Sequence, residues 1–228
     1  MIKAVIFDLD GLLADTEIVS YRIYQDMLAK YNVSFSIDYY AQNYSGKSEK
    51  NNLTHIISLF GLPLRLEDGY EYVEKKEMEL LEKGVALKLG AKELLEYLAE
   101  NNYKIGLATS SKQERALKIL KMNQVHQYFD TFTYTNEVKK GKPHPDIFLK
   151  ASEKIAVRPE ECLVLEDSEA GIEAGYQANM RVINIPDMIK PSEKYMKMIV
   201  KQCDTLFEVI PYLENITQKN RGEYSGKK

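Results

Sequence analysis

Cysteine is scarce in this sequence: among 228 residues only Cys162 and Cys203 carry a thiol. Two cysteines exclude a disulfide framework and a cysteine-rich zinc site, and we expect two buried thiols in a reducing compartment. The length is ample for a sizeable hydrophobic core, so folding requires neither disulfides nor a structural metal ion.

An excess of one charge sign and a long apolar run are absent as well. The 31 basic and 34 acidic residues give a formal net charge of −3, so no overall positive field attracts nucleic acid or an anionic membrane. No segment approaches the ~18 consecutive apolar residues of a membrane span. The first apolar run is short and ends at an acid, Asp8, which is unlike a signal peptide. We therefore expect a cytoplasmic protein that binds neither nucleic acid nor membranes.

Short apolar runs alternate with helical patterns over most of the chain. Several of these runs are continuously apolar, which is typical of strands buried on both faces of a parallel sheet. The alternation predicts an α/β fold, a Rossmann-like parallel sheet flanked by helices. The predicted strands are Ile2–Phe7, Lys104–Ala108, Thr131–Thr135, Cys162–Leu165 and Arg181–Ile185. The predicted helices between them include Ala91–Asn101, Gln113–Met122 and Pro145–Ile155.

One interval breaks the alternation, because about a hundred residues separate the first two predicted strands, far more than one crossover helix requires. Within it, Thr16–Lys30, Ser48–Phe60 and Glu67–Gly84 have helical patterns. This predicts a helical domain, residues 15–82, inserted into a discontinuous α/β domain of residues 1–14 and 83–228. From about residue 214 the tail is polar without an apolar period, and we expect it to fray.

The most informative motif, Asp8-Leu9-Asp10-Gly11, directly follows the first predicted strand. In open α/β sheets, ligands bind beyond the carboxyl ends of the strands. Asp8 and Asp10 can point the same way, and Gly11 permits a tight turn. Two carboxylates so close repel each other unless a cation neutralises them, which favours Mg²⁺ as a cofactor.

Two other readings of local motifs fail. A calcium loop of the EF-hand type would need Asp or Asn, Gly and Glu where this chain has Leu12, Leu13 and Val19. The segment Ser45–Ser48 resembles the end of a phosphate-binding P-loop, but Ala41 stands where that motif needs glycine, and no strand pattern precedes it.

Polar groups suited to phosphate binding follow the later strands. Thr109 and Ser110 offer a hydroxyl and backbone amides after the second predicted strand, Lys142 offers a positive charge, and Glu166 and Asp167 follow the fourth. Each has an ordinary alternative: Thr109 as a helix N-cap, the lysine as a solvated side chain, the two acids as caps. Together, at the carboxyl ends of successive strands, they predict a site for phosphoryl transfer.

With these motifs the chain resembles the haloacid dehalogenase superfamily, and more closely its phosphatase and β-phosphoglucomutase-like branch, which has a helical cap after the first strand. The resemblance extends to about Leu213. The segments Gly141–Asp146 and Leu165–Gly171 also match this branch. The four motifs of the superfamily stand in order as Asp8-Leu9-Asp10-Gly11, Thr109, Lys142 and Glu166-Asp167.

The resemblance implies a two-step mechanism in which Asp8 attacks phosphorus and forms an aspartyl-phosphate. Asp10 would act first as a general acid toward the leaving group and then as a general base. Thr109, Ser110 and Lys142 would hold the phosphoryl oxygens, with Thr109 and Lys142 counted among the catalytic residues.

The resemblance also implies a Mg²⁺ ion. Its ligands would be a side-chain oxygen of Asp8, the backbone carbonyl of Asp10, and Asp167, with Glu166 close by. Because the dehalogenases of this superfamily lack the second acid, Asp10 argues against dehalogenation.

The resemblance further implies that a cap segment ending at Gly46 faces the active site. Asp15, Gly46 and Lys47 are therefore predicted substrate-binding residues, with Asp15 and Thr16 at the hinge of a cap that closes to exclude water. Solvated surface lysines remain the simpler explanation for Lys47 and Lys50. The many tyrosines of the insert could stack on a sugar, but their helical spacing favours a place in the hydrophobic core.

The expected function is hydrolysis of a small phosphate monoester, such as a sugar phosphate, by a monomer. A sugar-phosphate mutase of the β-phosphoglucomutase type is the first alternative. Such mutases carry a histidine where this chain has Ser20 and an arginine where it has Glu49, which argues against mutase activity. A non-catalytic module that binds a phosphorylated metabolite is the second alternative, and the intact motif set argues against it.

Overall fold

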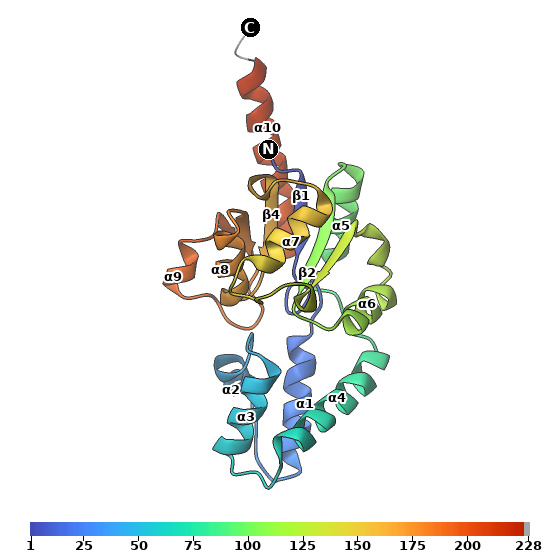
Figure 1. Ribbon diagram of the computed structural model, residues 1–228, viewed down its shortest axis with the longest axis vertical. Helices are drawn as coiled ribbons and strands as arrows, with labels where there is room; N and C mark the ends of the chain where they lie inside the picture. The colour runs from blue at the N-terminus through green and yellow to red at the C-terminus, as the bar shows by residue number, and fades with distance from the viewer. Residues whose placement is uncertain (226–228) are drawn as a thin grey trace. The chain divides into compact units, whose positions relative to one another are not determined.

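The chain divides into two compact units. The computed structural model describes residues 1–225. Met1–Ala14 and Leu87–Lys228 form one unit, called the core unit below, and Asp15–Ala86 form the other, called the cap unit (Figure 1). The predicted insert ended at residue 82, whereas the cap unit continues to Ala86. The four added residues follow the last helix of the cap unit, α4: Lys83 is its C-cap, Gly84 has φ +94°, and neither Val85 nor Ala86 is helical.

The core unit contains a parallel sheet, and the α/β fold predicted from the sequence is confirmed. Within the described residues the strand order is β3-β2-β1-β4-β5-β6, and every neighbouring pair is parallel. The first five strands were predicted to within two residues at each end, and β6 was missed because it has only two residues. The strands are β1 (Ala4–Phe7), β2 (Lys104–Thr109), β3 (Thr131–Tyr134), β4 (Cys162–Glu166), β5 (Arg181–Asn184) and β6 (Lys201–Gln202).

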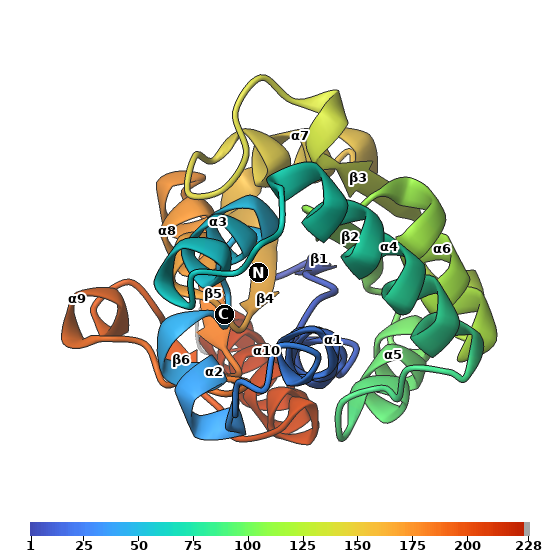
Figure 2. The ribbon, with the colours of Figure 1, turned by 90° about the horizontal axis from the view of Figure 1, so that it is seen from below.

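Helices cover both faces of this sheet, as the continuously apolar strands require. Figure 2 shows α7 (Asp146–Ile155) and α8 (Glu169–Gln177) on one side of the strands and α5 (Ala91–Glu100) and α10 (Val209–Ser225) on the other. Alternate strand residues such as Ala4 and Ile6 join the apolar cluster under α7 and α8. The remaining elements are α6 (Gln113–Met122), α9 (Glu193–Met196) and the 3₁₀ turns His126–Tyr128, Thr135–Glu137, Pro159–Glu161 and Leu206–Glu208.

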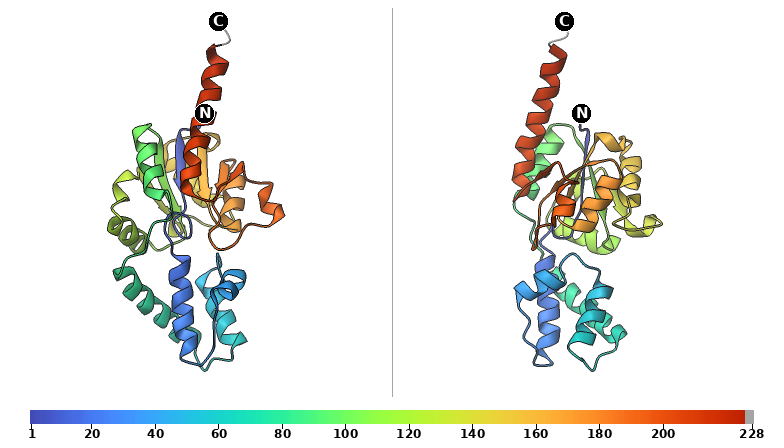
Figure 3. Two further views of the ribbon diagram at one scale, coloured as in Figure 1. Left: turned by 180° about the vertical axis from the view of Figure 1, so that it is seen from behind. Right: turned by 90° about the vertical axis from the view of Figure 1, so that its left-hand side faces the viewer.

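The tail prediction was wrong within the described residues, because α10 continues to Ser225 (Figure 3). The helix is anchored at its start by Val209 and Leu213, which are fully buried. Each residue after Leu213 then adds a backbone hydrogen bond to a helix already nucleated. Pro211 stands in the first turn of α10, where its missing N–H breaks no helical hydrogen bond. Residues 226–228 of the predicted frayed tail lie outside the described residues.

The cap unit is helical, as predicted. Its helices are α1 (Glu17–Ala29), α2 (Ile37–Asn43), α3 (Glu49–Leu59) and α4 (Leu66–Glu82) among the residues that the structure describes. The sequence missed only α2, whose 7 residues are too few to show a helical period.

Aromatic side chains form the core of the cap unit. Tyr24, Tyr40 and Tyr44 are buried, and Phe35 lies 6.3 Å from the ring of Tyr40 and 5.5 Å from that of Tyr44. These tyrosines therefore serve packing, the alternative that their spacing favoured over stacking on a sugar.

No helix among the described residues is both long and apolar enough to span a membrane.

Candidate active site

The candidate site lies at the carboxyl edge of the sheet. Asp8 directly follows the central strand β1, and its backbone amide donates to Leu165 O of the neighbouring strand β4 at 3.1 Å. Thr109 and Glu166 are the last residues of the flanking strands β2 and β4. Because β1, β2 and β4 are parallel, their ends meet at one edge. Asp8, Thr109 and Glu166 are all buried there.

Lys142 is the link between these strand ends. Its ammonium donates to Asp8 Oδ1, to Glu166 Oε1 at 2.5 Å and to Ala108 O at 3.3 Å. These three bonds use all three donors of the group. The side chain is only 8% exposed, so Lys142 is not a solvated surface lysine.

The burial of this cluster shifts the pKa values of its members. Burial raises the pKa of Asp8 to about 7; Lys142 opposes that rise, and the carboxylates of Glu166 and Asp10 add to it. For Lys142, burial alone would lower the pKa, but the carboxylates of Asp8 and Glu166 outweigh it and raise the pKa above its ordinary value. Lys142 therefore keeps its positive charge beside Asp8.

Glu166 has both carboxylate oxygens occupied. Oε1 accepts from Lys142, while Oε2 accepts from the backbone amides of Asp167 and Ser168 at 3.1 and 3.2 Å and from Ser168 Oγ at 3.0 Å. Ser168 is also the N-cap of α8 and accepts from Gly171 N at 3.1 Å. Capping is thus carried by Ser168, and Glu166 is placed to hold Lys142.

The turn after Asp8 brings two more carboxylates together. The Asp10 amide donates to Asp8 Oδ2 at 2.9 Å. Gly11 has φ +79°, and a Cβ there would run into the Asp167 carboxylate and come within 3.2 Å of Asp187 Oδ2. Glycine is therefore required both by the left-handed backbone and by the approach of these acids.

The donor set at this edge suits a hard divalent cation. Mg²⁺ usually binds through one or two carboxylates and keeps its other positions for water and phosphate oxygens. Within the described part of the chain, no three acidic, histidine or cysteine side chains converge on one point. The arrangement of Asp8 and Asp167 around the Asp10–Gly11 turn fits a Mg²⁺ ion that binds two carboxylates and keeps its other positions for water and phosphate. It does not form a closed cage of protein ligands.

Thr109 is not a helix N-cap, because the N-cap of α6 is Lys112. Its hydroxyl oxygen accepts from Ser111 N at 3.0 Å, and the hydroxyl lies 3.5 Å from Asp10 Oδ2. Ser110, the next residue, is exposed. The end of β2 and the residue after it thus place Thr109 and Ser110 at the edge where Asp8 lies.

Sequence reasoning missed the partners of the Asp10 side chain. Ser111 Oγ donates to Asp10 Oδ2 at 2.6 Å, and Arg115 Nη1 donates to Asp10 Oδ1 at 2.5 Å. The signal for Ser111 was its place two residues after a strand end. Arg115 lies inside a helix, where an arginine normally indicates a solvated face.

A second missed pair is Lys88 and Asp187, which form a salt bridge within the core unit. The Asp187 side chain is 7% exposed. It follows β5 by three residues, so the rule that placed Asp8 and Asp167 at strand ends could have found it. With Asp187, the ends of β1, β4 and β5 each supply a carboxylate to this edge.

The predicted substrate-binding residues Asp15, Gly46 and Lys47 belong to the cap unit. There, Lys47 is exposed and its ammonium donates to Asn43 O at 2.6 Å. Gly46 has φ +70°. Their part in substrate binding stays a prediction.

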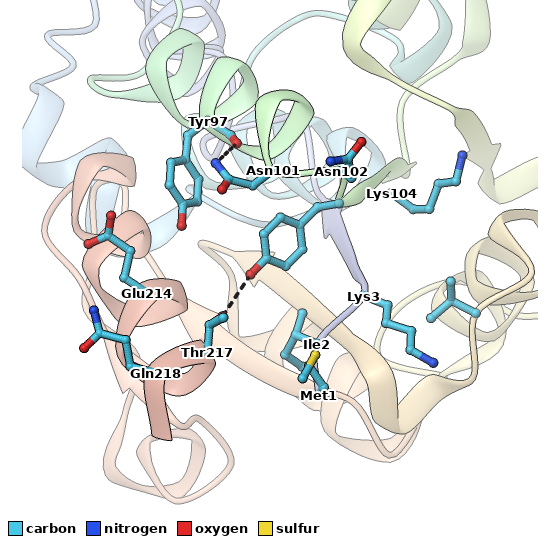
Figure 4. Close-up of a pocket in the computed structure, with 12 residues that line it drawn as sticks. Met1, Ile2, Lys3, Tyr97, Asn101, Asn102, Lys104, Glu214, Thr217 and Gln218 are labelled. Atoms are coloured by element: carbon cyan, nitrogen blue, oxygen red, sulfur yellow. Dashed lines mark hydrogen bonds between the residues drawn. The ribbon is translucent and has the colours of Figure 1, made fainter. Parts of the chain in front are cut away.

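A separate hollow of about 660 Å³ lies at the opposite edge of the sheet, beside α5 and α10 (Figure 4). It is lined by Lys3, just before β1, and Lys104, the first residue of β2, together with Tyr97 and Thr217. Tyr103 Oη lies 3.4 Å from Thr217 Oγ1 there. Because it lies at the amino ends of the strands, this hollow is not the candidate active site.

The comparison with family models identifies the chain. Residues 5–185 match the model of the haloacid dehalogenase-like hydrolases, a span that includes Asp8, Thr109, Lys142 and Asp167. The chain belongs to this family. As a haloacid dehalogenase-like protein it is an enzyme, and the resemblance inferred from its motifs is confirmed.

Similar proteins include both phosphatases and mutases. A phosphorylated carbohydrates phosphatase of Thermotoga maritima is 32% identical over 181 residues, which are 79% of this chain and 83% of the relative. A β-phosphoglucomutase of Bacillus subtilis is 34% identical over 194 residues, 80% of this chain and 83% of the relative. A crystal structure of a Clostridium difficile β-phosphoglucomutase has a TM-score of 0.75 at 26% identity, with all of both chains covered.

Proposed function

We propose that this chain is a Mg²⁺-dependent phosphatase that hydrolyses a small phosphate monoester through an aspartyl-phosphate. The observation that carries the proposal is the buried ammonium of Lys142, which bridges Asp8 and Glu166 at the carboxyl edge of the sheet. A fixed positive charge beside a carboxylate is what an incoming phosphoryl group requires, because its negative oxygens would otherwise be repelled.

In the first step, an Asp8 carboxylate oxygen attacks phosphorus and the bond from phosphorus to the ester oxygen breaks. Asp10 gives a proton to that oxygen, so the alcohol leaves neutral. Lys142, Thr109 and the Ser110 amide hold the phosphoryl oxygens, and Glu166 keeps Lys142 in place.

In the second step, Asp10 accepts a proton from water, and the water oxygen attacks phosphorus. The bond to Asp8 breaks, which releases inorganic phosphate and restores both carboxyl groups. The same two residues thus serve both steps, as nucleophile and as proton carrier.

The residues that would hold Mg²⁺ are Asp8, Asp167 and the backbone carbonyl of Asp10, with Glu166 supporting the site through Lys142. When bound, the ion would offset the negative charge that gathers on the phosphoryl group and on Asp8. Asp187 lies next to Asp167 at Gly11 and would orient ligands around the ion.

A sugar phosphate or a similar metabolite is the substrate class that we favour. The named relatives act on phosphorylated carbohydrates or on phosphoglucose, according to their names. In this proposal Asp15, Gly46 and Lys47 of the cap unit contribute to substrate binding, and the site works in a monomer.

A β-phosphoglucomutase-type activity is the second candidate, and the relatives that bear this name favour it. Against it stand Ser20 and Glu49, where such mutases carry histidine and arginine. A mutase must also protect its aspartyl-phosphate from water, whereas a phosphatase need not.

The experiment is phosphate release from a panel of metabolite phosphate esters, with and without Mg²⁺, for the natural protein and for Asp8→Asn. We expect Mg²⁺-dependent release from the natural protein and none from Asp8→Asn, which should keep its fold. Turnover by Asp8→Asn would show that Asp8 is not the nucleophile. Phosphate release that EDTA does not reduce would contradict the proposed dependence on Mg²⁺.

A second assay separates phosphatase from mutase: β-glucose 1-phosphate with a glucose bisphosphate activator. Glucose 6-phosphate formed without free phosphate would overturn the phosphatase proposal in favour of the mutase. If the protein shows no turnover in either assay, but a phosphate ester raises its thermal stability, it would instead be a binding module.

A further inference from the structure

The Asp10 side chain lies in a closed set of hydrogen bonds with two residues of the loop and helix after β2. Arg115 Nη1 donates to both Asp10 Oδ1 and Ser111 Oγ, each at 2.5 Å, and Ser111 Oγ donates to Asp10 Oδ2 at 2.6 Å. Each carboxylate oxygen of Asp10 is thereby tied to a different partner. The three side chains form a ring of contacts that fixes the orientation of the carboxylate.

This ion pair differs from the surface pairs of the same protein. The Arg115 side chain is 15% exposed and that of Asp10 is 28% exposed. In a surface pair such as Arg65 and Asp68, the side chains are 78% and 38% exposed, and the residues lie three positions apart at the start of α4. Arg115 instead reaches across 105 positions of sequence to the loop that carries the nucleophile. Exposed pairs hold their geometry weakly, whereas partly buried pairs with several bonds hold it firmly.

Arg115 affects the proposed proton transfer through the orientation of the Asp10 side chain. Asp10 is attached through its own backbone amide to Asp8 Oδ2, so its main chain is fixed beside the nucleophile. The side chain still has rotatable bonds, and proton transfer requires its oxygen to stay within hydrogen-bond reach of the reacting group. Arg115 and Ser111 restrict that rotation through the shorter bonds, and the Thr109 hydroxyl lies 3.5 Å from Asp10 Oδ2.

We propose that Arg115 is a positioning residue, which acts through Ser111 and directly on Asp10 to orient the carboxylate for proton transfer in both steps. This inference rests on the proposed function, because the role of Asp10 belongs to it. Arg115 binds Asp10 and Ser111, whereas Asp8 is held by Lys142. Loss of Arg115 should therefore impair proton transfer while the nucleophile and the phosphate-binding lysine remain in place.

The test uses two phosphate esters that differ in their need for a general acid. One is the sugar phosphate that the natural protein hydrolyses best, whose alkoxide must be protonated as it leaves. The other is 4-nitrophenyl phosphate, whose nitrophenolate leaves without a proton. Because kcat/KM reports the steps up to release of the first product, it isolates the first step for each ester.

For Arg115→Gln we expect kcat/KM on the sugar phosphate to fall by about 10²-fold, within the range that general acid catalysis contributes. On 4-nitrophenyl phosphate we expect kcat/KM to change little. Hydrolysis of the aspartyl-phosphate still needs Asp10 as a base. With 4-nitrophenyl phosphate, Arg115→Gln should therefore release a burst of nitrophenolate before a slow steady state. Ser111→Ala should show the same pattern more weakly, and Arg115→Lys should recover part of the loss.

The matched control is Lys121→Gln, which removes a positive charge from the same helix at an exposed position and should leave both esters unaffected. Circular dichroism checks that each variant is folded. Equal losses on the two esters, or none on either, would overturn the inference while leaving the phosphatase intact. If the natural protein releases phosphate from neither ester, the proposed function itself has failed.

Discussion

At the scale of single residues, the candidate site depends on charges that are buried together. Lys142 satisfies two carboxylates that are almost wholly inaccessible to water, Asp8 and Glu166. Removing one member of such a group leaves a charge without compensation in a medium that solvates it poorly. The cluster is therefore important for stability as well as for the proposed chemistry.

We expect Lys142→Met to lower the free energy of unfolding by about 3–5 kcal/mol, because Asp8 and Glu166 would be left uncompensated. Phosphatase activity should be lost in the same variant. Urea unfolding followed by circular dichroism measures the first effect. Lys140→Met, at an exposed position two residues away, is the control and should be neutral.

The double variant Lys142→Met, Glu166→Gln sharpens this test. Neutralising Glu166 removes one of the uncompensated charges, so stability should recover in part while activity stays lost. A Lys142→Met protein as stable as the natural one would contradict the buried ion cluster.

A pair of glycines on α8 separates packing from positioning. A Cβ at Gly171 would collide with the Glu166 carboxylate, whereas one at Gly175 would lie 2.8 Å from Val182 Cγ2 and 3.3 Å from Val164 Cγ1. Both substitutions to alanine overpack the same helix against the sheet, and each should cost about 1–3 kcal/mol of stability.

Only Gly171→Ala should also impair the site, because it displaces the residue that holds Lys142. We expect kcat for phosphate release to fall well below that of Gly175→Ala when both are assayed at a temperature where both are folded. Equal kcat values for the two variants would show that Glu166 does not need its present position.

At the scale of elements, the amino ends of β1 and β4 are joined by one acidic residue. Glu161 O accepts from Lys3 N at 2.8 Å, and its carboxylate binds Lys3 at 2.8 Å and Arg158 at 3.2 Å. Arg158 first, and Lys3 with it, lower the pKa of Glu161 from its ordinary value of 4.5 to about 2. The junction is thus held by a carboxylate that stays ionised in mild acid.

This lowered pKa makes a prediction about acid stability. A group with a depressed pKa in the folded state stabilises the fold fully above its ordinary value, and that stabilisation is lost as the pH falls toward about 2. Glu161→Gln should therefore be less stable than the natural protein at neutral pH. The difference between the two should shrink as the pH falls through this window.

Urea unfolding at pH 7 and at successively lower pH values measures that difference. A difference between the proteins that does not change with pH would mean that the carboxylate charge is not what joins the two strands.

At the scale of the whole molecule, the two chain segments of the core unit meet where the insert begins and ends. Ala14 and Leu87 form an antiparallel bridge, and Lys88 N donates to Leu13 O at 2.9 Å. The two ends of the core chain therefore lie next to each other where the insert begins and ends. A short linker can span that gap.

We expect a protein in which a short Gly-Ser linker replaces residues 15–86 to fold with a cooperative thermal transition, because the sheet and its apolar cluster lie in the core unit. It should still release nitrophenolate from 4-nitrophenyl phosphate, while its preference among sugar phosphates should be lost. Preferences equal to those of the natural protein would contradict the predicted role of Asp15, Gly46 and Lys47.

The sequence by itself determined the α/β fold and the placement of Asp8, Thr109, Lys142, Glu166 and Asp167 near one edge. It could do so because strand periodicity is local, and parallel strands bring their carboxyl ends together whatever their loops contain. It also predicted the helical insert, since no single crossover needs so long a segment.

Only the tertiary structure decided which side chains meet at that edge. Arg115 reaches Asp10, Lys88 reaches Asp187, and Glu166 holds Lys142 instead of capping a helix. These pairs join positions up to 105 residues apart, and no local pattern specifies the rotation of one helix over the sheet. That rotation is set by side-chain packing across the whole core, which is why the pairs that orient the site became visible only with the fold.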